Sequence, residues 1–159
     1  MEFKNLKLTN SHVCDCMSGA INTNSEMFIR RIGAKKVKAG DFKVKIERED
    51  TVDGDTCDEF CSQREISINN IERYDKDEII ESYKIELMKQ KKYAPNIEFF
   101  YSEFCFSDGS GRVKHTPQHG HESHHDFYKS DTFDISMLQI NGDPVRVAFV
   151  NTLVQEPSK

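Results

Sequence analysis

The sequence predicts an α+β protein with a largely antiparallel sheet of about 6–7 strands and one principal helix at about residues 76–92. One long stretch has helical periodicity, and several short stretches have strand-like patterns. The strand-like stretches after the helix follow one another directly, which favours antiparallel pairing. At 159 residues the chain is expected to form a single domain over 1–159.

The helix has signals at both ends. Asp75 is the expected N-cap, with Glu78 three positions later. Lysines gather near the other end, where they suit the negative end of the helix dipole, and Pro95 stops the helix. The apolar residues that form one stripe are Ile79, Ile80, Tyr83, Leu87 and Met88.

The clearest strand pattern before the helix lies in residues 41–47. There Phe42, Val44 and Ile46 alternate with charged residues, which predicts a strand with one face on the core. Further strands are expected at 2–8 and 27–32, and the acidic stretch 47–59 is expected to be a solvated loop.

After the helix the pattern is that of a sheet. Residues 97–106 are apolar on both faces, which predicts a central strand. The last two strands are expected to pair as a hairpin across 141–144, and the segment 115–131 is expected to be a long irregular connection. The strands expected after the helix are 97–106, 112–115, 133–140 and 145–153.

Composition and charge limit the classes of partner and the cellular location that we expect for the protein. The formal net charge is −5 and the pI about 5.7, which argues against nucleic-acid binding. The N-terminus lacks the apolar core of a signal peptide, and no apolar run approaches membrane-spanning length. We therefore expect a soluble cytoplasmic protein without a membrane partner, which binds another protein or a small ligand.

A cluster of histidines is the strongest hint of chemistry. Five of the six histidines lie within eleven residues, and imidazole is a common metal ligand. We expect His119, His121, His125 and Asp126 to be candidate ligands for Zn²⁺ or another divalent transition metal. Two alternatives stay open, namely a surface loop whose histidines only titrate and a pH-dependent interaction surface.

His121 to His125 also fits the H-E-x-x-H pattern of metalloproteases. In that reading His121 and His125 bind the metal and Glu122 is the catalytic general base. The motif normally lies within a regular helix, whereas here Gly120 precedes it and no third histidine follows. The sequence therefore favours a small binding, regulatory or interaction domain, with a metal-dependent hydrolase as the alternative.

The cysteines offer a second candidate metal site. Cys14 and Cys16 form one close pair, and Cys57 and Cys61 form another, so that four thiolates could bind a structural zinc. The spacings differ from the C-x2-C of common zinc ribbons. An odd number of cysteines in a chain of this size favours reduced thiols without metal, with Cys105 in the core.

Overall fold

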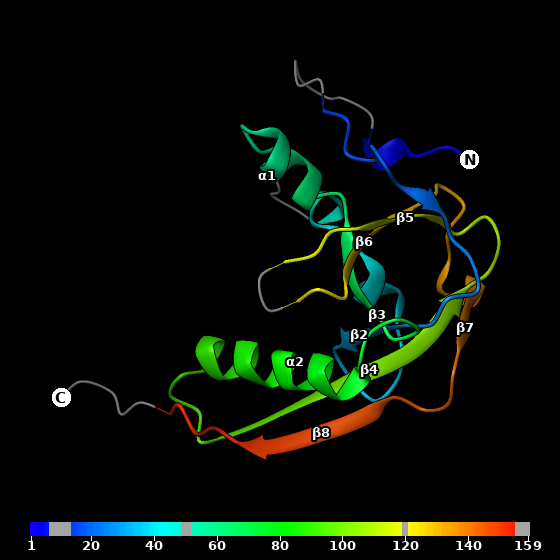
Figure 1. Ribbon diagram of the computed structural model, residues 1–159. Helices are drawn as coiled ribbons and strands as arrows, with labels where there is room; N and C mark the ends of the chain where they lie inside the picture. The colour runs from blue at the N-terminus through cyan, green and yellow to red at the C-terminus, as the bar shows by residue number, and fades with distance from the viewer. Residues whose placement is uncertain (7–13, 49–51, 119–120, 155–159) are drawn as a thin grey trace.

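A computed structural model describes residues 1–6, 14–48, 52–118 and 121–154. It confirms the α+β class, with one curled antiparallel sheet and one long helix, α2 (Lys76–Gln90), packed on it (Figure 1). The strands are β1 (Ile21–Asn22), β2 (Phe28–Ile32), β3 (Ile66–Asn70), β4 (Asn96–Phe106), β5 (Gly111–His115), β6 (His124–Lys129), β7 (Leu138–Ile140) and β8 (Val145–Val150).

The order of the strands is β1-β5-β6-β3-β2-β4, and both β7 and β8 pair with β4. The helix α2 begins as predicted, because the carboxylate of Asp75 accepts hydrogen bonds from the backbone N–H groups of Asp77 and Glu78. Its buried residues recur every four positions and pack against β2, β4 and β8. These residues are Ile79, Tyr83 and Leu87.

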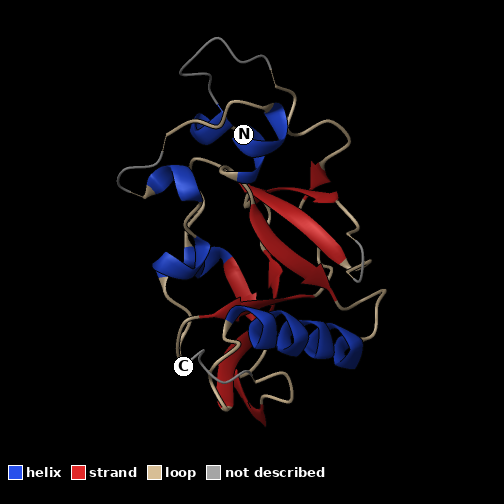
Figure 2. Cartoon of the chain, turned by 90° about the vertical axis from the view of Figure 1, so that its left-hand side faces the viewer, coloured by secondary structure: helices blue, strands red, loops and turns tan. Residues whose placement is uncertain are grey.

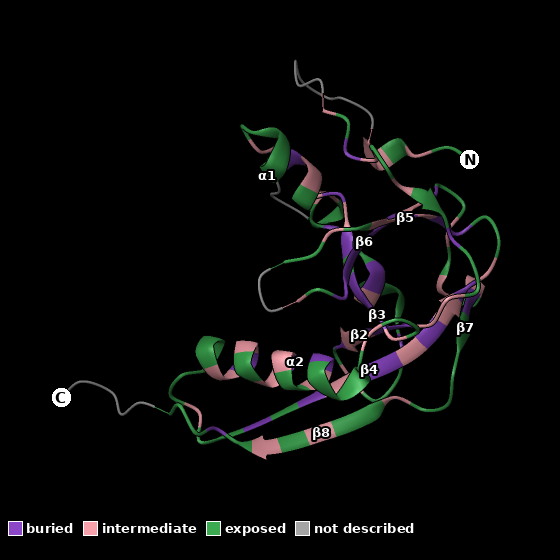
Figure 3. Ribbon diagram, in the orientation of Figure 1, coloured by how far each residue is buried: buried purple, intermediate pink, exposed green. Residues whose placement is uncertain are grey.

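The strand β4 is buried on different faces in its two halves. Phe99 and Tyr101 pack beneath α2, whereas Phe104 and Phe106 pack inside the curl of the sheet with residues of β2, β3 and β6. Successive side chains of a strand point to opposite faces, so this change requires apolar residues of both parities. It confirms the predicted central strand and explains its apolar pattern (Figure 3).

The predicted hairpin of the last two strands is wrong. β7 pairs with the C-terminal half of β4, and β8 pairs with its N-terminal half, so the two lie end to end along one edge of β4. The backbone N–H of Asn141 donates to the carbonyl oxygen of Glu103 on β4. The connection therefore continues beside β4, where a hairpin turn would reverse the chain.

The predicted strand at 41–47 is also wrong, because the chain forms the short 3₁₀ helices Ala39–Phe42 and Lys45–Glu47 there (Figure 2). The alternating burial is real, since Phe42 and Val44 are each 1% exposed. However, the backbone N–H of Val44 donates to the carboxylate of Glu47, and the N–H of Glu47 donates to the carbonyl oxygen of Val44. Local hydrogen bonds thus replace the partners that a neighbouring strand would provide.

Four further differences concern short segments of the chain. Residues 4–6 form a 3₁₀ turn in place of the predicted strand at 2–8, whose last two residues lie outside the described part of the chain. β3 was not predicted. β6 lies within the segment that was expected to be irregular, and the acidic stretch 47–59 contains the start of α1 (Cys57–Ser62).

A buried arginine just before β3 contacts both α1 and the segment that precedes it. The guanidinium of Arg64 pairs with the carboxylate of Asp53, donates to the carbonyl oxygen of Phe60 at 3.0 Å and lies 3.5 Å from the centre of the Phe60 ring. Phe60 packs with Cys16 and Tyr128 in a small cluster of its own. Within the described residues, no helix combines the length and apolarity needed to cross a membrane.

Candidate functional site

The face of the sheet that carries α2 continues beyond the helix as a polar strip. Strand register places Asn69 of β3 beside His124 of β6, and Ser67 of β3 beside Asp126 of β6. Paired residues of neighbouring strands lie on the same face. The helix covers the apolar part of this face over β2 and β4, so the polar side chains of β3 and β6 line the open part.

A cleft of about 480 Å³ lies over this strip, between α2 and the turn that joins β5 to β6. Figure 1 shows the β5–β6 hairpin opposite the helix. The walls of the cleft come from α2, β2, β3 and the end of the hairpin. The lining residues are Arg30, Arg31, Ile32, Ser67, Asn69, Tyr83, Glu86, Gln90, Gln118, His121 and His124.

One carboxylate of α2 contacts two basic side chains in the cleft. Oε1 of Glu86 lies 3.1 Å from Nε2 of His121, and Oε2 lies 3.6 Å from Nη2 of Arg31. The guanidinium of Arg31 also lies 5.5 Å from the centre of the Tyr83 ring, within the range of a cation–π contact. Glu86 therefore neutralises part of the positive charge of the cleft and links the helix to the hairpin.

Arg30 brings a second guanidinium to the cleft. β2 and β3 pair only through Phe28–Asn70 and Ile29–Asn69, and beyond these pairs the guanidinium of Arg30 bridges the strands by donating to the carbonyl oxygen of Ser67 at 2.6 Å. Its Nε donates to the carbonyl oxygen of Asp41 at 2.8 Å. Burial lowers the pKa of Arg30 from its usual value, because water solvates this charge poorly.

Two polar side chains on the floor of the cleft are held in place. The Tyr83 hydroxyl donates to Oδ1 of Asn69 at 2.5 Å, and Nδ2 of Asn69 donates to Oγ of Ser123 at 3.0 Å. Nδ1 of His124 lies 2.8 Å from Oγ1 of Thr116 and 3.1 Å from the carbonyl oxygen of the same residue. Burial lowers the pKa of His124, which favours the neutral ring.

The structure separates the predicted metal ligands. His121 lies against Glu86 on α2. His125 and Asp126 are consecutive residues of β6 and therefore point to opposite faces of the sheet. The ring of His125 stacks on His115 with 4.7 Å between ring centres, on the inner face of the sheet. His119 lies outside the described residues.

These positions leave the metal prediction without support. In the described ranges, no three or more His, Cys, Asp or Glu side chains are arranged to hold a metal ion. The hydrolase geometry is absent as well, because His124 begins β6 and residues 121–125 form a turn and a strand instead of one helical turn. Glu122 lines a neighbouring hollow of about 290 Å³, and its carbonyl oxygen lies 2.7 Å from Nε2 of His115.

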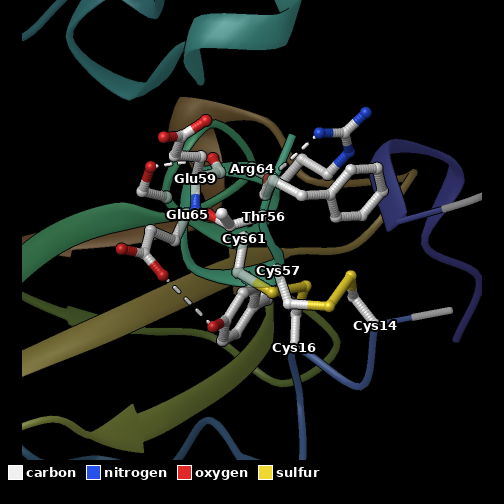
Figure 4. Close-up of a disulfide and its surroundings, with 11 residues drawn as sticks. Cys14, Cys16, Thr56, Cys57, Glu59, Cys61, Arg64 and Glu65 are labelled. Carbon is white, nitrogen blue, oxygen red and sulfur yellow. Dashed lines mark hydrogen bonds between the residues drawn. A yellow bond between two sulfur atoms is a disulfide. The ribbon is translucent and has the colours of Figure 1, made fainter. Parts of the chain in front are cut away.

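The expectation of reduced thiols is wrong for four of the five cysteines. Cys14 bonds to Cys57 and Cys16 bonds to Cys61, so the N-terminal segment is tied to α1 by two disulfides (Figure 4). Sulfur atoms bonded to each other are not thiolates and cannot bind the zinc ion that the spacing suggested. Cys105 remains free but is only half-buried, where a core position was expected.

Sequence reasoning missed a pair of carboxyl groups at the other end of the polar strip. Burial and the nearby Asp126 raise the pKa of Glu65 to about 8. The Tyr128 hydroxyl donates to Oε2 of Glu65 at 3.2 Å. Asp126 was considered only as a metal ligand, because nothing in the sequence showed that β3 and β6 are neighbours. Knowing that β3 and β6 pair would have shown that the two carboxyl groups lie close together.

The residues of the cleft come from segments that are far apart in the sequence, and they form no linear motif. Arg30 and Arg31 are consecutive, but Asn69, Glu86 and His121 belong to three other segments. The chemistry of the site is therefore argued from its geometry. No protein-family model matches this sequence, and neither a curated protein nor a solved structure matches it.

Proposed function

We propose that the protein is a binding domain that holds a small carboxylate- or phosphate-bearing ligand in the cleft between α2 and the β5–β6 hairpin. One observation carries this proposal: Arg30 and Arg31 both line the cleft, and Glu86 is the carboxylate that faces them there. Guanidinium groups bind carboxylates and phosphates through paired hydrogen bonds. A ligand anion would complete the charge balance that Glu86 achieves only in part.

The size and polarity of the cleft suit such a ligand. A volume of about 480 Å³ lies within the usual range of small-molecule sites. Asn69, Gln90 and Gln118 add neutral polar groups that can bind the uncharged part of the ligand. A binding role is favoured over the hydrolase alternative because His121 and His125 are directed toward different surroundings.

The test is calorimetric titration of the purified, oxidised protein with inorganic phosphate and with citrate. We expect Arg31→Gln to weaken the binding of at least one of these anions about tenfold, since a hydrogen bond to a charged group contributes about 1.5–3 kcal/mol. Arg146→Gln is the matched control, because Arg146 pairs with Glu98 outside the cleft. Absence of binding to both anions, or equal binding by the two variants, would overturn the proposal.

We also infer that the protein works in an oxidising compartment instead of the cytoplasm that the sequence suggested. The support is the pair of disulfides, since such bonds are rare where glutathione keeps thiols reduced. Cells that express the protein are lysed in an alkylating agent, and the modified cysteines are counted by mass spectrometry. We expect label on Cys105 alone, whereas label on all five cysteines would contradict this location.

A further inference from the structure

A second hollow, of about 320 Å³, lies beside the disulfides and differs from the cleft in its charge. Its carboxylates are Asp15, Asp58, Glu65 and Asp126, and the opposing charge in its lining is that of Lys114. We call it the acidic cavity. The four carboxylates come from two sources, the disulfide-linked segments on one side and the sheet on the other.

The disulfides fix the positions of two of the four acidic side chains. Asp15 lies between Cys14 and Cys16, and Asp58 directly follows Cys57. The bonds from Cys14 to Cys57 and from Cys16 to Cys61 therefore hold the two aspartates near each other and near the sheet. Like charges brought together in this way repel each other unless a cation lies between them. The covalent links thus maintain an arrangement that electrostatic repulsion alone opposes.

Asp126 provides an independent sign that the cavity lacks a cation. It is only 6% exposed, and its Oδ1 is a buried atom without a hydrogen-bond partner. Nδ1 of His124 lies 3.8 Å from this oxygen, and burial lowers the pKa of that histidine, so the ring adds little positive charge. A buried carboxylate oxygen without a donor is costly, and a bound donor would recover that free energy.

We propose that the acidic cavity binds an alkylammonium group, the cation found at the end of a lysine side chain and in polyamines. An ammonium group has three donors, and the carboxyl groups that line the cavity, those of Asp126, Glu65, Asp15 and Asp58, offer it acceptors. Burial, together with the nearby Asp126, raises the pKa of Glu65 to about 8, so at neutral pH this carboxyl keeps a proton that the ammonium group would replace. A bare metal ion fits less well, because the described residues hold no group of three ligands around one point.

The test is titration of the oxidised protein with two probes, spermidine and an acetylated, amidated lysine, followed by calorimetry and by NMR shifts. Asp126→Asn removes the unpartnered carboxylate, and Asp15→Asn and Asp58→Asn remove exposed carboxylates whose loss leaves the core intact. Glu81→Gln is the matched control, because it removes the same charge from an exposed position on α2. We expect about a tenfold loss of affinity for the cavity variants and no change for the control.

The outcomes separate the two sources of the cation. Binding of spermidine alone points to a polyamine, whereas binding of both probes points to a lysine side chain of a partner. No binding of either probe would overturn the proposal, and so would an equal loss in Glu81→Gln, which would mean diffuse attraction to an acidic protein. The acidic cavity does not depend on the cleft, so Arg31→Gln should bind the ammonium probes normally whether or not the cleft binds anions.

Discussion

Oε1 of Glu86 lies 3.1 Å from Nε2 of His121, which joins the middle of α2 to the turn between β5 and β6. The other oxygen of the same carboxylate lies 3.6 Å from Nη2 of Arg31. Glu86 occupies the place next to Arg31 that the carboxylate or phosphate of a ligand would take. The side chain therefore competes with the proposed ligand and also holds one wall of the cleft.

Glu86→Gln should strengthen the binding of the anion identified by titration. The substitution keeps the size of the side chain but removes the competing charge beside Arg31. A partly exposed ion pair contributes up to about 1 kcal/mol, so we expect a gain in affinity of about fivefold by calorimetry. Glu81→Gln, on the same helix but paired with Lys84, should change nothing. Weaker binding by Glu86→Gln would mean that Glu86 contacts a donor of the ligand.

The contribution of each disulfide to the free energy of unfolding should depend on whether the other disulfide is present. Removing the first should cost less than removing the second. They join positions 43 and 45 residues apart, and either bond alone closes nearly the same loop. The loop-closure model assigns about 4 kcal/mol to the first bond and about 2 kcal/mol to the second. Replacing Cys14 and Cys57 by Ala should therefore lower the free energy of unfolding by about 2 kcal/mol, and replacing all four cysteines by about 6 kcal/mol.

Urea unfolding of the wild type, the two paired variants and the fourfold variant measures this difference. Cys105→Ala is the control for loss of a cysteine outside the disulfides. If the losses of the two paired variants add up to the loss of the fourfold variant, the shared-loop explanation is wrong.

The sequence predicts a helix or strand correctly where the pattern that indicates it lies within that element. α2 has a capping carboxylate at Asp75 and apolar residues on one side, and β4 has a continuous apolar run. Both signals are contained within the element, so no knowledge of the neighbours is needed. β6 shows the opposite case, because His124 and Asp126 are buried between polar partners supplied by β3 and β5. Because these buried residues are polar, the sequence of β6 shows no alternation of apolar and polar residues.

The candidate site was predictable only in part for the same reason. The histidine cluster lies in the region of the cleft, since His121 and His124 line it. The predicted metal site stays a prediction without support, because a strand directs His125 and Asp126 to opposite faces, whereas the prediction needs them to converge. Arg31 and Glu86 come together through the packing of α2 on the sheet. That contact is long-range, and a single sequence carries no trace of it.

Glu65→Gln should change how stability depends on pH. Burial and the nearby Asp126 raise the pKa of Glu65 from 4.5 to about 8 in the folded protein. Between these two values the folded state keeps a proton that the unfolded chain releases, so this group lowers stability as the pH rises from about 4.5 to 8. Glutamine stays neutral, so the variant should gain stability relative to the wild type across this window.

The midpoints of urea unfolding at about pH 5 and about pH 8, near the two ends of this window, measure the effect. The quantity of interest is the difference between variant and wild type, because other groups titrate equally in both. Glu81→Gln is exposed and should follow the wild type. Parallel curves for Glu65→Gln and the wild type would show that Glu65 titrates normally in the folded protein.

Gly111→Ala should destabilise the β5–β6 pair severely. A Cβ at this position would lie 2.1 Å from the carbonyl oxygen of Tyr128 and 3.0 Å from Cα of Lys129, and backbone atoms of a paired strand cannot move aside. Its φ of 154° adds a conformation that alanine rarely adopts. We expect a loss above about 3 kcal/mol in urea unfolding, or failure to fold. Gly40→Ala is the control, because no atom lies within 4 Å of its added Cβ, and it should change stability by less than about 1 kcal/mol. A mild effect at Gly111 would mean that β5 and β6 lie farther apart at this end than the structure places them.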